Sequence, residues 1–255
     1  MSADRYARLP AGWSASSGCL RERVVLITGA SGGLGRATAL AATRSGASVI
    51  LLGRKVRALE KAYDELGALG LAQPAIYPLD LSGATPNDYA ELAATIEREF
   101  GRLDGIVHAA AHFGGLQPAA NIAPDDWLRS LHVNLSAPFM LTQACLPLLQ
   151  QAGDASVVFV LDDPARMAKA HWGAYGVAKQ GLSGLASILH EELENTSIRV
   201  HALLPMPMRT ALRRAAYYGE NTLDLPVPDV AADALVYLLG ADGVAARGKV
   251  LDLRV

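Results

Sequence analysis

Short apolar runs alternate with amphipathic stretches along the chain from residue 24 onward. Continuous runs of β-branched and other apolar residues are typical of strands buried in a parallel sheet, whereas apolar positions three and four apart are typical of helices. The pattern predicts strands at Val24–Thr28, Ser48–Leu52, Ala75–Leu79, Gly105–Ala109, Ser156–Leu161, Arg199–Leu204 and Lys249–Leu253. It predicts helices at Gly35–Ser45, Val56–Leu69, Asn87–Phe100, Asp125–Gln151, Trp172–Glu194 and Val230–Leu239.

This alternation predicts the fold class. Strands joined through helices by right-handed crossovers form a parallel sheet with helices on both faces. We therefore expect an α/β protein with one doubly wound, three-layer domain over residues 23–255, preceded by a loosely ordered N-terminal arm at residues 1–22. Ligands of such folds bind beyond the carboxyl ends of the strands, so residues that follow strands are the first candidates for a site.

Composition argues against several classes of function. The 255 residues carry a net charge of -2 and contain no basic block that would favour nucleic acid. The apolar runs are too short to span a bilayer, and the first 20 residues lack the apolar core of a signal peptide. Two cysteines form no disulfide framework, and six histidines show no metal-binding spacing. We expect a cytoplasmic protein without a nucleic-acid, membrane or metal partner.

A glycine-rich turn, TGASGGLG at residues 28–35, lies between the first predicted strand and the first predicted helix. Such a turn lets the backbone approach a ligand closely and leaves the first N–H groups of the helix unpaired and partly positive. That arrangement is an anion site suited to a pyrophosphate. The glycines Gly29, Gly33 and Gly35 have the spacing G-x-x-x-G-x-G, which differs from the G-x-G-x-x-G dinucleotide fingerprint. Taken alone, the stretch is equally compatible with a plain glycine-rich turn.

Three further strand ends carry candidate binding residues. Arg54 follows the second predicted strand, where an arginine accommodates the 2′-phosphate of NADP in place of the carboxylate that binds the ribose of NAD. NADP is therefore the expected cofactor, with NAD less favoured; the alternative is that Arg54 merely begins the next helix. Asp80 follows the third strand at the same edge of the sheet. The fourth strand runs into His108–Ala111, whose small residues let a flat ring pass close by.

Two later helices carry candidate catalytic residues. Tyr175 and Lys179 are four residues apart and therefore share one face of a helix. An ammonium beside a phenol lowers the pKa of the phenol, and such a tyrosine can exchange a proton with a substrate oxygen. Asn134 lies within the apolar stripe of the Asp125–Gln151 helix, where a polar side chain needs partners. Two interpretations of Asn134 are open: a functional role, or a core asparagine whose polar groups bond to the backbone.

Four motifs follow one another along the chain: T-G-x-x-x-G-x-G at residues 28–35, Asp80, Asn134 in V-N-L, and the Tyr175-x-x-x-Lys179 pair. In this order they resemble the short-chain dehydrogenase/reductase (SDR) family of Rossmann type. The resemblance extends over residues 23–252. It implies that the glycine turn cradles the pyrophosphate and that Asp80 sits by the adenine. It further implies that Tyr175 is the general acid/base and that Lys179 binds the nicotinamide ribose and lowers the pKa of the tyrosine. Asn134 would hold a water that links the lysine to solvent.

The resemblance also implies further cofactor contacts and an assembly. The additional cofactor contacts that it implies are Ser31, Leu34, Leu81, Ala109, Ala110 and Pro205. Members of the family pair their long helices across a two-fold axis, so we expect a homo-dimer or homo-tetramer that uses Asp125–Gln151 and Trp172–Glu194.

Three positions depart from the family pattern. Asp162 stands thirteen residues before Tyr175, where the family has a serine, and no serine lies between Ser156 and Tyr175. An ionised Asp162 only accepts hydrogen bonds and raises the pKa of the tyrosine, whereas a protonated Asp162 would donate as a serine does. Met206 replaces the glycine that lies near the nicotinamide, and His108–Ala111 replaces an N-N-A-G sequence.

Two functional hypotheses follow. The first is an NADP-dependent oxidoreductase that moves a hydride between nicotinamide and a small carbonyl or alcohol substrate, with Asp162 as an imperfect replacement for serine. The second is a catalytically impaired NADP(H)-binding protein that acts as a sensor or assembly partner. Residues 206–228 form the expected substrate lobe and lid. Apolar and aromatic side chains cluster around these positions, namely Met167, Trp172, Met206, Met208, Tyr217 and Tyr218. An apolar substrate would suit them as a group, whereas core packing or an interface is the stronger explanation for any single one.

Overall fold

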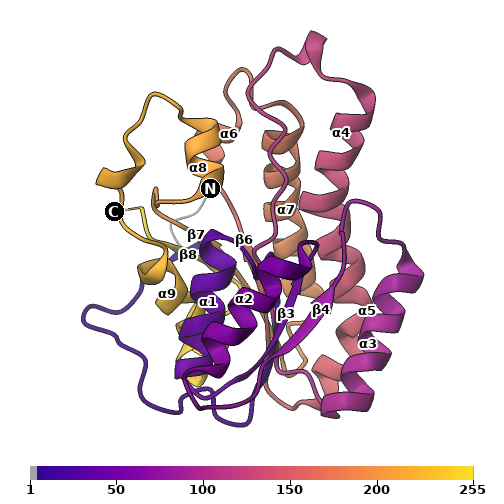
Figure 1. Cartoon of the computed structure of the whole chain (residues 1–255), viewed down its shortest axis with the longest axis vertical. Helices are drawn as coiled ribbons and strands as arrows, with labels where there is room; N and C mark the ends of the chain where they lie inside the picture. Colours follow the sequence, from indigo (N-terminus) through magenta and orange to yellow (C-terminus); the bar gives the residue numbers. More distant parts are fainter. Residues whose placement is uncertain (1–4, 255) are drawn as a thin grey trace.

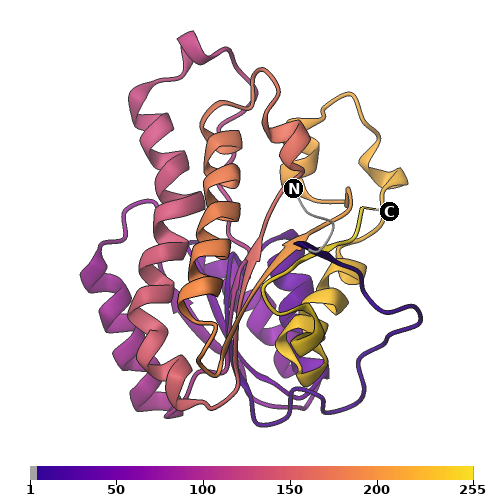
Figure 2. The ribbon, with the colours of Figure 1, turned by 180° about the vertical axis from the view of Figure 1, so that it is seen from behind.

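A computed structural model describes residues 5–254, which form a parallel sheet covered by helices on both faces (Figures 1 and 2). The sheet has eight strands in the order β1-β8-β7-β6-β5-β2-β3-β4. The strands are β1 (Tyr6–Ala7), β2 (Val24–Thr28), β3 (Ser48–Gly53), β4 (Ala75–Pro78), β5 (Gly105–His108), β6 (Ala155–Val160), β7 (Ile198–Leu204) and β8 (Val250–Asp252). The predicted α/β fold with a doubly wound parallel sheet is confirmed.

The helices form two outer layers. One face of the sheet is covered by α1 (Gly33–Arg44), α2 (Val56–Gly67) and α9 (Asp229–Leu239), and the other by α3 (Pro86–Phe100), α5 (Ala137–Gln151) and α7 (Gly173–Glu192). Two short helices, α6 (Pro164–Met167) and α8 (Ala211–Ala216), lie above the carboxyl ends of the strands (Figure 1). Short 3₁₀ turns are η2 (Ala119–Asn121), η4 (Thr222–Asp224) and η5 (Ala241–Ala246). Most predicted bounds differ from the observed ones by one or two residues, as element ends commonly do.

Alternating side chains of each strand build two hydrophobic cores. In β2, Val24 and Leu26 pack with α3, α5 and α7, whereas Val25 and Ile27 pack with α1, α2 and α9. Every residue of β2 is buried because the strand is covered on both sides. This double burial explains why the strands read as continuous apolar runs rather than as alternating patterns.

The N-terminal arm differs from its prediction. Residues 1–4 lie outside the described residues, but β1 pairs in parallel with β8 and forms one edge of the sheet. Trp13 packs edge-on against Tyr237 of α9 at 5.2 Å between ring centroids, and Leu20 is fully buried. A loosely ordered arm is therefore wrong for residues 5–22. A two-residue strand leaves too short an apolar pattern to be recognised in the sequence.

The predicted Asp125–Gln151 helix is interrupted. It consists of α4 (Pro124–Leu131), the π-helical turn η3 (His132–Ser136) and α5. A π turn inserts one residue into the helix and commonly marks a functional position. Asn134 lies within this turn, so the polar residue in the apolar stripe coincides with the irregular backbone.

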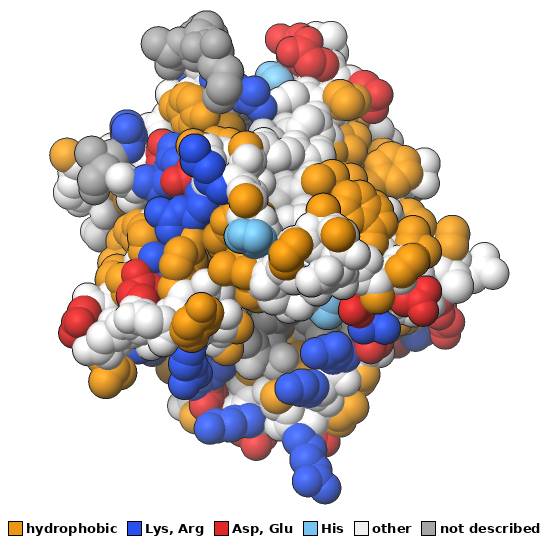
Figure 3. All heavy atoms as spheres, turned by 90° about the horizontal axis from the view of Figure 1, so that it is seen from above, with side chains coloured by type: hydrophobic (Ala, Val, Ile, Leu, Met, Phe, Trp, Pro, Cys, Tyr) orange, Lys and Arg blue, Asp and Glu red, His pale blue; other side chains and the backbone are white. Residues whose placement is uncertain are grey.

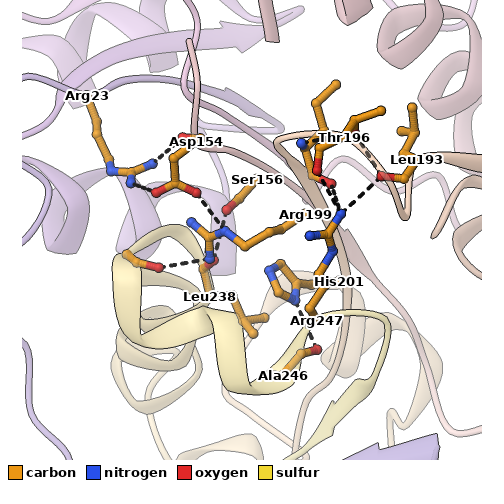
Figure 4. Close-up of polar contacts among 12 residues, drawn as sticks. Arg23, Asp154, Ser156, Leu193, Thr196, Arg199, His201, Leu238, Ala246 and Arg247 are labelled. Carbon is orange, nitrogen blue, oxygen red and sulfur yellow. Dashed lines mark hydrogen bonds and ion pairs between the residues drawn. The ribbon is translucent and has the colours of Figure 1, made fainter. Parts of the chain in front are cut away.

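Polar side chains around the buried Arg199 form a network at the amino ends of the strands (Figure 4). Asp154 accepts hydrogen bonds from Arg23 and, at 2.9 Å, from Arg199. Arg199 also donates to the carbonyl oxygen of Gly240, at 2.9 Å. Arg247 donates to carbonyl oxygens that follow α7, including that of Leu193 at 3.0 Å. These contacts join the starts of β6 and β7 to the end of α9, and the segment before β8 to the end of α7.

No helix in the described part of the chain combines the length and the hydropathy that crossing a membrane requires.

Candidate active site

A cavity of about 610 Å³ opens beyond the carboxyl ends of the strands. It lies where the strand order reverses between β2 and β5, which is the position at which doubly wound sheets bind their ligands. Every cofactor-binding and catalytic residue predicted above lines it, except Asn134. Figure 3 looks down on this end of the molecule, where Lys and Arg side chains gather beside apolar ones on the side of α8.

The glycine turn forms one end of this cavity, and close backbone packing requires its glycines. A Cβ atom on Gly29, whose φ is +68°, would lie 2.8 Å from the Cα of Ala110, and one on Gly35 would lie 2.3 Å from the carbonyl oxygen of Gly29. Helix α1 begins at Gly33 without a side chain that caps its first N–H groups. These free amides face the cavity from the positive end of a helix, so the turn fits a pyrophosphate.

Arg54 and Asp80 stand at the rim of the same cavity, after β3 and β4. Both side chains are exposed, which leaves the Arg54 guanidinium accessible to a phosphate. The backbone N–H and the hydroxyl of Ser82 donate to Asp80 at 3.0 and 2.7 Å. These hydrogen bonds, with a smaller contribution from Arg54, hold the pKa of Asp80 below its ordinary value. Asp80 is therefore a fixed acceptor near the exposed guanidinium of Arg54.

Tyr175 and Asp162 meet at the other end of the cavity. The hydroxyl of Tyr175, at the start of α7, donates to Oδ2 of Asp162 over 3.0 Å. Oδ1 of Asp162 accepts the backbone N–H of Asp163 at 2.8 Å. Both oxygens of this half-buried side chain therefore take part in hydrogen bonds. The position that the resemblance assigns to serine is thus occupied by an acceptor that contacts the tyrosine directly.

Lys179 lies one turn after Tyr175 and is fully enclosed. Its Nζ lies 5.7 Å from the centre of the Tyr175 ring and donates to the carbonyl oxygen of Val160 at 2.8 Å. Burial lowers the pKa of Lys179 to about 8, against a smaller upward effect of Asp162. Burial, followed by Asp162, raises the pKa of Tyr175 well above its ordinary value. The prediction of a lowered tyrosine pKa is wrong in this structure, because desolvation and the carboxylate of Asp162 raise the pKa of Tyr175.

Asp162 and Lys179 also line a second, smaller cavity of about 100 Å³. Its other walls include Arg5 and Tyr6, and Arg5 donates to Ser183 of α7 at 3.0 Å. The N-terminal strand therefore closes the back of the site, a role that the sequence pattern did not indicate.

Asn134 supports the site from behind the cavity wall. Its Oδ1 accepts the backbone N–H of His112 at 3.0 Å, and its Nδ2 donates to the carbonyl oxygens of His112 and Ser130, both at 2.8 Å. The side chain is 1% exposed and its hydrogen-bonding groups are engaged by these neighbours. This geometry matches the alternative of a satisfied core asparagine, and it fixes the segment after β5 that lines the cavity.

Aromatic rings lie next to Tyr175 and continue from it to Tyr217. The centroid of Phe113 lies 5.5 Å from that of Tyr175, Trp172 lies 6.0 Å from it, and Tyr217 lies 5.9 Å from Trp172. Of the predicted substrate-lobe residues, Trp172, Met206, Met208 and Tyr217 line the cavity, whereas Met167 is buried beneath the aromatic cluster. The structure does not bring Tyr218 to the cavity, since this residue is 89% exposed and is not part of the lining.

Sequence reasoning missed Phe113 and Arg166. Phe113 follows β5 by a few residues, so its position after a strand end was an available signal. Arg166 lies in α6, a four-residue helix with no periodic pattern to place it. Only the fold brings α6 over the cavity, next to α8.

His108 is a core residue. Its ring stacks on Phe159 at 4.9 Å, and its Nε2 lies 2.8 Å from the hydroxyl of Thr142. Burial lowers the pKa of His108 to about 3, so the ring is neutral. Among residues 5–254, no group of three or more His, Cys, Asp or Glu side chains is placed to hold a metal ion.

Comparison with known proteins gives a consistent assignment. A sequence model of the family described as short chain dehydrogenase matches residues 23–221. The chain is 35% identical to the uncharacterized oxidoreductase YciK of Escherichia coli K12, over 91% of this chain and 92% of that protein. A short chain dehydrogenase structure from Pseudomonas syringae superposes with a TM-score of 0.92 at 41% identity, covering 96% of this chain and 99% of that one. A short chain dehydrogenase from Escherichia coli CFT073, complexed with NADPH, superposes with a TM-score of 0.89 at 35% identity, covering 93% and 98%.

Proposed function

Since the chain belongs to the short-chain dehydrogenase family, we propose that it is an NADP(H)-dependent oxidoreductase acting on a small carbonyl or alcohol substrate. One observation carries the proposal: a single cavity joins the uncapped start of α1 and Arg54 to the hydroxyl of Tyr175. The structural relative that is complexed with NADPH supports the choice of coenzyme.

Different residues around the cavity would bind different parts of the coenzyme. The amides of the glycine turn would hold the pyrophosphate, Arg54 the 2′-phosphate and Asp80 the adenosine end. The remaining contacts would come from Ser31, Leu34, Leu81, Ala109, Ala110 and Pro205, together with Tyr175 and Lys179. When bound, the nicotinamide supplies or accepts the hydride.

Tyr175 would move the proton. In the reductive direction its hydroxyl gives a proton to the substrate oxygen, and in the oxidative direction it takes that proton back. Lys179 places a cation beside the ring and stabilises the phenolate. Asn134 fixes the backbone of His112, which lines the cavity, and so acts through positioning.

Asp162 would make this catalysis weak or altered. A serine at this place donates a hydrogen bond to the substrate oxygen, and an ionised Asp162 cannot donate. The loss of one such donor costs about 10²–10³ in rate. In addition, the carboxylate holds the hydroxyl of Tyr175 and opposes its ionisation.

These same contacts favour a second candidate function, a coenzyme-binding sensor or assembly partner with little turnover. Met206 adds to this case, since its side chain lines the cavity at the position of the glycine near the nicotinamide. A methionine there narrows the space for the ring.

The consumption of NADPH by native protein, Asp162→Ser and Tyr175→Phe distinguishes the two functions. The assay would use a panel of ketones, quinones and 3-oxoacyl thioesters. The proposed enzyme reduces at least one carbonyl in its native form and loses that activity in Tyr175→Phe. Turnover by Asp162→Ser alone would favour the sensor instead.

We also propose a homo-dimer or homo-tetramer built on the helices α4, α5 and α7. Four of their large apolar side chains are exposed, namely Leu128, Phe139, Val177 and Ile188. Figure 2 shows α5 and α7 side by side on one face of the molecule. Light scattering that returned a 26.8 kDa particle would contradict this assembly. A cytoplasmic location and a boundary near residue 22 remain predictions of the sequence.

A further inference from the structure

The arginines at the substrate end of the cavity differ in whether a carboxylate of the protein pairs with them. Arg213 forms two hydrogen bonds to Glu220, at 2.6 and 2.7 Å. Arg254 pairs with Asp252 at 2.9 Å and with Asp163 at 3.1 Å. The guanidinium groups of both arginines are therefore neutralised within the protein.

Arg166 differs from these two arginines. Over residues 5–254 it forms no ion pair, and the one hydrogen bond from its guanidinium runs from Nη1 to the hydroxyl of Tyr217 at 2.6 Å. Its Cζ lies 5.1 Å from the centre of the Tyr217 ring. This contact orients the guanidinium at the cavity wall, and among the described residues its other N–H groups have no acceptor.

Aromatic rings connect Arg166 to the reacting end. Tyr217 lies beside Trp172, and Trp172 lies beside Tyr175, with Phe113 packed against both Trp172 and Tyr175. Flat ring systems pack well in such surroundings, through offset or edge contacts at similar centroid distances. A molecule on this wall would meet the phenol at one end and the guanidinium at the other.

We propose, on the basis of the function proposed above, that the substrate is an aryl ketone or the corresponding alcohol that carries a carboxylate. The aromatic part packs along Trp172 and Tyr217, the carbonyl oxygen meets the hydroxyl of Tyr175, and the carboxylate binds Arg166. A planar guanidinium matches a carboxylate through two parallel hydrogen bonds. A purely apolar substrate would cover this cation and leave it unpaired, which is unfavourable.

Calorimetric titration of the protein loaded with NADP⁺ tests this proposal without turnover, because the oxidised coenzyme cannot reduce a ketone. The ligands are 4-acetylbenzoate and 6-acetyl-2-naphthoate, each compared with its methyl ester. We expect at least one acid to bind roughly 10- to 100-fold more tightly than its ester, as a hydrogen-bonded charge pair requires. Equal affinities for acid and ester would overturn the proposal.

Two variants assign the effect to the residue. Arg166→Met keeps the length of the side chain and removes the charge, so the affinity for the acid should fall to that for the ester. Arg214→Met is the matched control, because Arg214 is exposed on α8 and does not line the cavity. An equal loss for acid and ester in Arg166→Met would assign Arg166 a structural role and overturn the proposal.

Salt dependence of the native protein keeps the test valid if Arg166→Met fails to fold. Higher ionic strength should weaken binding of the acid and leave binding of the ester unchanged. A salt-independent affinity for the acid would contradict the charge pair. Failure of NADP⁺ to bind would reject the proposed function itself, whereas coenzyme binding with neither acid nor ester bound would reject only the substrate class.

Discussion

The hydroxyl group of Tyr175 donates a 3.0 Å hydrogen bond to the carboxylate of Asp162. The two residues come from different elements, since Asp162 follows β6 and Tyr175 lies in the first turn of α7. The bond stabilises the protonated phenol, whereas the nearby Lys179 stabilises the phenolate. The catalytic strength of the site depends on which of these opposing effects prevails once coenzyme and substrate are bound.

Replacing the carboxylate should make Tyr175 easier to ionise. In Asp162→Ser the pKa of Tyr175 should fall, because the negative charge and its hydrogen bond are removed while burial stays the same. Ultraviolet difference titration, with Tyr175→Phe subtracted to isolate this phenol, measures the change. Asp163→Ser is the control, since Asp163 pairs with Arg254 and has no contact with the phenol. An unchanged pKa in Asp162→Ser would show that the carboxylate does not govern the tyrosine.

Lys179 should make stability depend on pH. Its pKa falls from 10.5 to about 8 on folding, so the unfolded chain binds this proton more tightly than the native protein. Between about pH 8 and pH 10 the unfolded state carries more protons, and the free energy of unfolding therefore rises with pH. Relative to Lys179→Met, the native protein should gain about 2 kcal/mol between pH 7.5 and pH 10.

Urea unfolding at a series of pH values measures this difference. Subtraction of the variant removes the contributions of other groups, such as Cys145, whose buried thiol has its pKa raised to about 12. Lys169→Met serves as the control, because Lys169 is exposed. Parallel pH profiles for native protein and Lys179→Met would mean that Lys179 titrates as an ordinary lysine.

Arg54 should select the coenzyme. Arg54→Met should weaken NADPH binding about tenfold and leave NADH binding nearly unchanged, because only NADPH carries the 2′-phosphate. Arg57→Met removes a charge from the exposed surface of the following helix, outside the cavity lining, and should have little effect. Fluorescence titration of both coenzymes gives the ratio of their affinities. Equal losses of affinity for NADPH and NADH would contradict the assignment of Arg54 to the 2′-phosphate.

The glycine turn should tolerate a methyl group at one position and reject it at another. In Gly35→Ala the new Cβ would lie 2.3 Å from the carbonyl oxygen of Gly29, whereas in Gly32→Ala the nearest atom would be 3.9 Å away. We expect Gly35→Ala to cost about 2 kcal/mol or more and to lower Tm by about 5 °C or more. Gly32→Ala should stay close to the native Tm. Equal thermal unfolding of the two variants would contradict the packing of the turn.

The sequence predicts well what depends on periodic and local patterns. Buried strands such as β2 are continuous apolar runs, and glycines that close contacts require stand out between a strand and a helix. The order of strand ends then brings Arg54 and Asp80 to one cavity without knowledge of side-chain contacts. The resemblance to a family adds the roles, which the local patterns alone leave open.

Features that depend on tertiary contacts were not predicted from the sequence. The pairing of β1 with β8 involves two residues, and the π turn at Asn134 lies inside a stretch whose pattern predicts one continuous helix. The pKa of Tyr175 moves opposite to the expected direction because burial, which a sequence does not show, is its largest determinant. Arg166 reaches the cavity only through the packing of α6 beside α8.

Calorimetric titration of the native protein with NADPH tests the central claim most directly. We predict that NADPH binds with one site per chain and more tightly than NADH, since the amides of α1 and the guanidinium of Arg54 face one cavity. Folded protein that takes up neither coenzyme would contradict the assignment of this cavity to a pyridine nucleotide.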